Sequence, residues 1–254
     1  MCRKAADLLL ILTITLMYAA PSFGDGAVPL VLFDQGHNQR FLIEDSGELQ
    51  LSMLAETIKA QGARVSSTSI PLCDESLRGV SGLVISGPFE QLKPNEVEAV
   101  LNFLKRGGRL AAMLHIGPPL AGLLAALDVD SSNAVLHERL NIIDKNINFR
   151  VKTLSDSALF TGVSQFSVYG AWALRAGASS TIIAHTSPEA WVDLNGDGAL
   201  SNGDAVGAFG VALHGTLGAG SFVVFGDDAI FQNRFLDADN RKLGANLGSW
   251  LSGH

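Results

Sequence analysis

Apolar and polar positions predict alternating strands and helices along the first half of the chain. Residues 28–33 form an apolar, branched run typical of a buried strand, and residues 48–61 place apolar side chains at helical spacing before Gly62. The same patterns predict further strands at residues 64–69, 82–85 and 109–115, and further helices at residues 94–106 and 118–127. Because strands that alternate with helices form right-handed crossovers, this half predicts a parallel sheet with helices on both faces.

The second half of the chain has a different pattern. Short strand-like segments separated by Gly, Ser and Asp turns occur at residues 147–151, 171–174, 181–185, 206–213 and 221–225. We expect these strands to be antiparallel at least in part, and we expect a closing helix at residues 239–251. No internal repeat or low-complexity linker divides the chain, so residues 25–254 are predicted to form a single α/β domain.

The N-terminus has the pattern of a secretory signal. Arg3 and Lys4 precede an apolar run at residues 8–20, and small residues suitable for cleavage follow at residues 21–24. The run is shorter than the roughly 17–25 residues that span a bilayer, so a retained anchor is the less favoured alternative. We therefore predict a signal peptide at residues 1–24 and a periplasmic or secreted protein with no membrane span after cleavage.

Charge and cysteine content narrow the function further. The chain has a formal net charge of -7, and cleavage after residue 24 would bring the mature protein to -8. Nucleic acid is therefore excluded as a partner, because phosphate binding needs a basic surface. Cys73 is the only cysteine that remains after cleavage, so the mature chain cannot form an internal disulfide.

Residues 193–204 have the spacing of a calcium-binding loop, with oxygen-bearing residues at alternate positions and Gly198 at position 6. The predicted ligands are Asp193, Asn195, Asp197, Ala199, Ser201 and Asp204. Asn-Gly and Asp-Gly pairs also form ordinary hairpin turns, so a turn without metal is the alternative. Asp204 stands where Glu is usual, which predicts modest affinity, and we expect Ca²⁺ to stabilise this loop.

Several short motifs resemble the class I glutamine amidotransferase-like superfamily, and more narrowly its uncharacterised exported branch. They are Phe-Asp-Gln-Gly-His at residues 33–37, Gly-Leu-Val-Ile-Ser-Gly-Pro at 82–88, Phe-Leu-Lys-Arg-Gly-Gly-Arg-Leu at 103–110 and Val-Val-Phe-Gly-Asp-Asp at 223–228. The resemblance implies a flavodoxin-like three-layer sandwich with a mainly parallel sheet and additional antiparallel strands in the second half. It does not imply amidotransferase activity, because His115 and Ile116 stand where the nucleophilic cysteine would be.

Polar residues follow the predicted strands at their carboxyl ends, where open parallel sheets bind ligands. The predicted ligand-binding residues are Asp34, His37, Asn38, Ser86, His115, Asp227 and Asp228. Asp and His at such positions can hold a metal, position a water or hydrogen-bond a ligand. They also commonly cap helices or tie loops together, which is the structural alternative.

Two functional hypotheses follow from these patterns. The first is an exported, non-catalytic binding or scaffolding domain, stabilised by Ca²⁺, that recognises a small molecule or a protein. The second is a metal-assisted hydrolase that uses Asp34, His37, His115 and Asp227. Because the chain has neither a cysteine elbow nor a Gly-x-Ser-x-Gly motif, the first hypothesis is favoured and no residue is assigned as catalytic.

Overall fold

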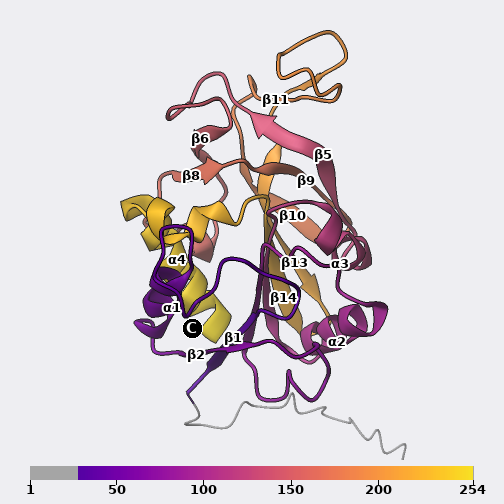
Figure 1. Ribbon diagram of the computed structural model, residues 1–254, viewed down its shortest axis with the longest axis vertical. Coiled ribbons are helices and arrows are strands. Elements are labelled where there is room, and N and C mark those ends of the chain that lie inside the picture. The colour runs from indigo at the N-terminus through magenta and orange to yellow at the C-terminus, as the bar shows by residue number, and fades with distance from the viewer. Residues whose placement is uncertain (1–27, 254) are drawn as a thin grey trace, which may run out of the picture.

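The computed structural model describes residues 28–253, and the predicted signal peptide lies outside this range (Figure 1). The longer helices are α1 (Ser52–Lys59), α2 (Pro94–Lys105), α3 (Ala121–Ala126) and α4 (Ala238–Ser252), with short 3-10 helices at Pro118–Leu120, Ala158–Phe160, Ala229–Phe231 and Asn233–Phe235. The strands are β1 (Leu30–Asp34), β2 (Arg64–Thr68), β3 (Gly82–Ser86), β4 (Arg109–Met113), β5 (Val129–His137), β6 (Asn148–Val151), β7 (Thr153–Leu154), β8 (Phe166–Tyr169), β9 (Trp172–Ala176), β10 (Ser180–His185), β11 (Trp191–Val192), β12 (Ala205–Val206), β13 (Gly210–Leu217) and β14 (Gly220–Phe225).

Most of the strands join one large mixed sheet of twelve strands. Along its main path the order is β12-β11-β5-β9-β13-β14-β4-β3-β1-β2, and β10 pairs with β13 and with β7. The strands β2, β1, β3, β4 and β14 are mutually parallel, while the remaining pairings of this sheet are antiparallel. A separate antiparallel pair consists of β6 and β8.

The prediction of a flavodoxin-like, mainly parallel three-layer sandwich is therefore wrong. Among the described residues the large sheet has four parallel pairings and seven antiparallel ones. The last helical crossover between parallel neighbours is α2, which joins β3 to β4. After β4 the chain passes through α3 into β5, which pairs antiparallel with β9 and β11. From there to β14 short turns replace crossovers, so neighbouring strands run in opposite directions.

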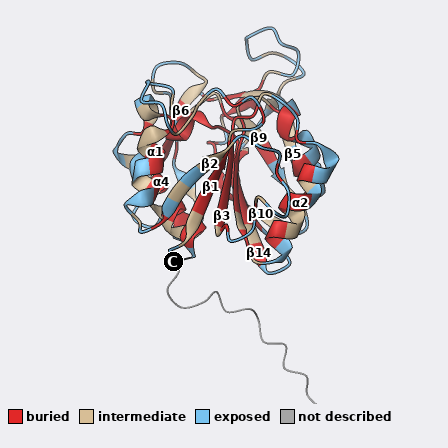
Figure 2. Cartoon of the chain, turned by 60° about the horizontal axis from the view of Figure 1, so that its bottom comes forward, coloured by how far each residue is buried: buried red, intermediate tan, exposed pale blue. Residues whose placement is uncertain are grey.

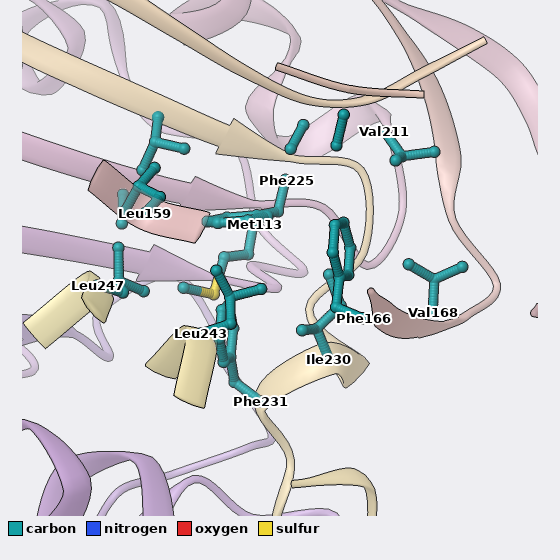
Figure 3. Packing of buried hydrophobic residues seen from close by; sticks show 14 of the residues in the cluster. Met113, Leu159, Phe166, Val168, Val211, Phe225, Ile230, Phe231, Leu243 and Leu247 are labelled. Atoms are coloured by element: carbon teal, nitrogen blue, oxygen red, sulfur yellow. The ribbon is translucent and has the colours of Figure 1, made fainter. Parts of the chain in front are cut away.

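Alternating side chains on the central strands fill two hydrophobic cores, one on each face of the sheet. On β1, Val31 and Phe33 contribute to the core beneath α1 and α4, whereas Leu32 contributes to the core beneath α2 and α3. Figure 2 shows these central strands buried between helices whose outer surfaces are exposed. In the first core, Leu243 and Leu247 of α4 pack near Met113 of β4, as Figure 3 shows. This period-2 burial fixes the strand register and holds the strand ends in place.

Asn240 attaches the C-terminal helix to the sheet. The side chain is fully buried in the first turn of α4, where its amide donates hydrogen bonds to the carbonyl oxygens of Ser167, Ile230 and Phe235. Its Oδ1 accepts a 2.8 Å hydrogen bond from the Ser167 amide. The segment that follows β14 is therefore held between α4 and β8, which orients the residues at the end of β14.

Candidate functional site

The predicted polar residues meet at one edge of the sheet because their strands are parallel. Asp34 ends β1, Ser86 ends β3, His115 follows β4, and Asp227 and Asp228 follow β14. Backbone hydrogen bonds continue past the strand ends, from the Gly87 amide to Met113 and from the Asp228 amide to Leu114. We call this edge, defined by the loops after β1, β3, β4 and β14, the carboxyl rim.

At the rim, His37 forms a buried charge network with two carboxylates. Its Nδ1 lies 2.7 Å from Asp34 Oδ2 and its Nε2 lies 3.2 Å from Glu96 Oε1. Gln39 also donates to Asp34 Oδ2, and the Glu96 carboxylate accepts the Leu72 amide. Burial opposes the charged imidazole, but hydrogen bonds and charges from Asp34 and Glu96 outweigh it and raise the pKa of His37.

The His37 network ties loops together and offers no free ligating atom. Both ring nitrogens of His37 are engaged, so this side chain cannot also bind a metal or accept a proton from a substrate. Asn38 has a positive φ of 56° and an exposed side chain, which is typical of a turn residue. The structure therefore places His37 and Asn38 at the rim, with the His37 ring nitrogens engaged inside the fold and the Asn38 side chain exposed.

A second pair at the rim joins His115 to Asp228. His115 Nδ1 lies 3.0 Å from Asp228 Oδ1, and the His115 side chain is 35% exposed whereas that of Asp228 is 1% exposed. The hydrogen bond to Asp228 is the main cause that raises the pKa of His115, while burial and the Arg40 charge oppose it. Burial raises the pKa of Asp228, and His115 opposes that change.

Asp227 lies beside this pair but points to the backbone. Its Oδ2 accepts the Tyr169 amide and its Oδ1 accepts the Ala229 amide. Burial and the neighbouring Asp228 charge raise the pKa of Asp227 to about 7, although the two backbone hydrogen bonds lower it. Asp227 thus stabilises the backbone of the rim from inside the protein and is not exposed at the surface.

The immediate surroundings of His115 are aromatic and cationic. The ring centroids of Phe41 and Phe89 lie 5.2 and 5.1 Å from that of His115. The Arg40 guanidinium carbon lies 4.4 Å from the Phe89 centroid, and Trp172 Nε1 donates to the His115 carbonyl oxygen. The sequence patterns did not predict Arg40, Phe41, Phe89 or Glu96 as rim residues. The first three lie in loops, which carry no periodic signal, and Glu96 lies in the first turn of α2, where an acidic residue is common for capping alone.

Two buried polar atoms of the rim have no hydrogen-bond partner among the described residues. They are Ser86 Oγ and Asp228 Oδ2. The turn at Gly87 shapes this region, because its φ is +52° and a Cβ there would collide with Asp228 Oδ2. Burying a polar atom without a hydrogen bond costs free energy of folding. The surrounding structure must therefore hold these two groups in place at the rim.

Three cavities of the described chain lie away from the His115–Asp228 pair. One of about 570 Å³ lies beside Leu77 and Phe103, one of about 350 Å³ lies beside Met53 and Arg241, and one of about 540 Å³ lies beside Ile43 and Glu44 of the loop after β1. None of the three is lined by His115, Asp228 or the aromatic rings beside them. The exposed rim groups therefore belong to a surface that can meet a group presented by a ligand or partner.

The predicted calcium loop forms an exposed hairpin between β11 and β12, at the top of Figure 1. Asp193 accepts the amides of Gly196 and Gly198, while Asp204 accepts those of Leu194 and Ser201. The remaining predicted ligands, Asn195, Asp197 and Ala199, take part in the same local hydrogen bonds. Within residues 28–253, no group of three or more His, Cys, Asp or Glu side chains is arranged to hold a metal ion.

Comparison with protein families gives a match over residues 44–247 to a model described as a domain of unknown function, DUF4350. The chain belongs to the DUF4350 family. The resemblance to the class I glutamine amidotransferase-like superfamily, including its exported branch, was wrong, because the family match and the structural neighbours indicate no such family. The short motifs that suggested it are strand ends and helix stops that unrelated α/β proteins also need.

Solved structures with a similar fold are distant in sequence from this DUF4350 domain. The mmIFT52 N-terminal domain has a TM-score of 0.70 at 16% identity, covering 88% of this chain and 98% of that one. Cytoplasmic protein STM1381 from Salmonella typhimurium LT2 has a TM-score of 0.58 at 16% identity, covering 89% and 100%. At this identity the likeness concerns the fold alone. No curated protein sequence matches the chain.

None of the helices that this DUF4350 domain forms within residues 28–253 is long and apolar enough to cross a bilayer.

Proposed function

We propose that this DUF4350 domain is a non-catalytic binding domain that recognises its ligand or partner at the carboxyl rim. The observation that carries the proposal is the His115–Asp228 pair. Asp228 is buried and holds Nδ1 of the ring, while the ring itself is 35% exposed beside Phe41 and Phe89. A polar group oriented by a buried partner and framed by apolar rings is the arrangement expected of a recognition site.

The alternative of a metal-assisted hydrolase receives less support from the same geometry. That mechanism needs Asp34, His37, His115 and Asp227 to act together, but His37 is saturated by Asp34 and Glu96. Asp227 is bonded to two backbone amides. A serine mechanism is not supported either, because Ser86 Oγ has no hydrogen bond to a base among the described residues.

The proposal can be tested by NMR titration of the full chain with four probes of different chemistry: inorganic phosphate, choline, glucose and N-acetylglycinamide. We expect at least one probe to shift resonances of rim residues saturably. The His115→Asn variant should weaken that binding about tenfold, because Asn can keep the hydrogen bond to Asp228 while the outer ring nitrogen is lost.

Hydrolysis assays with p-nitrophenyl acetate and p-nitrophenyl phosphate complete this test. A binding domain should give the background rate with both the natural protein and His115→Asn. Turnover that disappears in the variant would support the hydrolase instead. If none of the four probes perturbs the rim, the proposal is wrong.

We further propose that the domain works outside the cytoplasm and that Ca²⁺ stabilises the hairpin at residues 193–204. The first part rests on the signal pattern of residues 1–24, and the second on the ligand spacing of the hairpin. Cell fractionation followed by N-terminal sequencing tests the first. A mature protein that begins near Asp25 in the extracytoplasmic fraction is expected, and an uncleaved cytoplasmic protein would contradict it.

A further inference from the structure

Two basic side chains at the rim, Arg40 and His115, lie against the same aromatic ring. The Arg40 guanidinium carbon is 4.4 Å from the centroid of Phe89, and the imidazole of His115 is 5.1 Å from it. Arg40 is exposed and takes part in none of the ion pairs formed within residues 28–253. Both groups therefore contact Phe89, and they are near enough for the Arg40 charge to lower the pKa of His115, on a protein whose net charge is -7.

The bond to Asp228 determines which atom of His115 is available. Nδ1 lies against the Asp228 carboxylate, so the proton on that nitrogen is donated to Asp228. Nε2 is on the opposite side of the ring. Within the described chain, Nε2 of His115 has no hydrogen-bond partner of its own. A protonated His115 thus directs an unused N–H donor away from the protein interior.

The charges around His115 favour its protonated form. Asp228 and Asp227, both from the loop after β14, raise the pKa of His115, and Arg40 from the loop after β1 lowers it. Phe41 and Phe89 pack beside the ring, and the lower local dielectric strengthens a charge-assisted hydrogen bond made there. The positive charges available to a ligand are those of Arg40 and protonated His115, and the exposed Glu90 next to Phe89 is the acidic neighbour that forms none of the ion pairs within residues 28–253.

Building on the binding function proposed above, we propose that Arg40 and His115 bind an oxyanion, the carboxylate or phosphate group of the ligand. The Arg40 guanidinium and His115 Nε2–H act as its donors. Phe41 and Phe89 contact the apolar part of the molecule that carries the group. Oxyanions are the groups that guanidinium and imidazolium donors recognise best, since both partners of each hydrogen bond are charged.

Acetate and inorganic phosphate serve as probes for the two possible groups, and binding is measured at pH 6 through the backbone amide resonances of the rim loops, which the natural protein and every variant retain. We expect Arg40→Gln and His115→Asn each to weaken binding about tenfold, the loss of one charge-assisted hydrogen bond. Arg64→Gln, which removes an exposed arginine from β2, should leave the affinity unchanged. Arg40→Gln alters only an exposed side chain, so this variant should fold even if the protein does not tolerate a substitution at the partly buried His115.

The pH dependence gives a second readout. Acetate stays ionised between pH 6 and 8, so its affinity should fall as the pH rises through the pKa of His115 and should fall less in His115→Asn. Binding of one anion but not the other would identify the group. An equal loss in Arg64→Gln, or rim binding by choline or glucose but by neither anion, would overturn the oxyanion inference and leave the binding function standing. Failure of every probe would overturn both.

Discussion

At the scale of single residues, two histidines on the same rim have opposite roles because their partners differ. His37 lies between Asp34 and Glu96 and is almost wholly buried, so it contributes to folding. His115 has one carboxylate partner and an exposed edge, so it remains available to a ligand. The two histidines differ in how many of their ring nitrogens are hydrogen-bonded within the fold. The amino-acid sequence alone does not show this number.

Replacing His37 with Gln should destabilise the protein by about 3–5 kcal/mol, because Asp34 and Glu96 would stay buried without their shared cation. Urea unfolding measures this loss. His185→Gln provides the control, since His185 is partly exposed, and its change should stay within about 0.5 kcal/mol. Equal stability of the His37 variant and the natural protein would mean that the buried network contributes nothing to folding.

The sequence predicted which residue types reach the rim but not their contacts. Asp34, Ser86 and His115 could be placed together because parallel strands end at one edge. Arg40 and Phe89 could not, because their positions depend on how the loops after β1 and β3 fold over one another, through hydrogen bonds from the Phe89 and Glu90 amides to the His37 carbonyl. Such long-range contacts have no signature in a local pattern.

At the scale of elements, the helical and strand periods of the first half predicted its strands and helices well, and the second half less well. The strand β5 was missed because Asp130, Ser131 and Ser132 make it polar, with only Val129 and Leu136 buried. A strand that is only partly buried along most of its length, and polar there, lacks the apolar alternation on which prediction depends. Missing β5 also left out a strand that forms two antiparallel pairings, with β9 and β11.

The turn after β3 offers a test of how elements shape the rim. Gly87→Ala should destabilise the protein by about 2–4 kcal/mol, because an L-residue is strained at a φ of +52° and its Cβ would collide with Asp228. Gly122→Ala in α3 is the matched control, with open space around it and an expected gain of about 0.5–1 kcal/mol. A similar effect at both positions in thermal unfolding would show that the turn is not constrained.

The hairpin at residues 193–204 gives a second test at this scale. Millimolar Ca²⁺ should raise the melting temperature by about 2–4 °C, since a ligand that binds only the folded state stabilises it. The Asp193→Ala/Asp197→Ala double variant should lose this response, while Asp45→Asn, an exposed change outside the hairpin, should keep it. If the natural protein shows no response to Ca²⁺, the hairpin is an ordinary turn.

At the scale of the whole molecule, several buried groups at the rim titrate in the same direction. Their environments raise the pKa values of His37, His115 and Asp228, and raise the pKa of Asp227 to about 7. A folded-state pKa above the unfolded value means that the folded protein holds the proton more tightly. The stability that each of these groups contributes is present at low pH and is lost as the pH rises through its folded pKa.

The free energy of unfolding should therefore fall between pH 5.5 and pH 8. In Asp227→Asn the fall should be smaller by about 1–2 kcal/mol, because asparagine does not titrate and the folded state then has no proton to lose at this position. Burial lowers the pKa of His214, which acts in the opposite direction, so the comparison of the two proteins isolates Asp227. Urea titrations across this range measure both curves, and identical slopes would contradict the assignment.

The place of β14 in the sheet also has a consequence for synthesis. This strand lies between β4 and β13, yet residues 114–219 separate it from β4 along the chain, and α4, which contacts β1, β3 and β4, follows it. On the ribosome, a nascent chain therefore carries an open β4 edge and an uncovered apolar face until β14 and α4 have been synthesised. Unpaired strand edges of this kind promote aggregation. The polypeptide therefore depends on rapid pairing of β14 with β4 once β14 is made, or on a chaperone that covers the β4 edge until then.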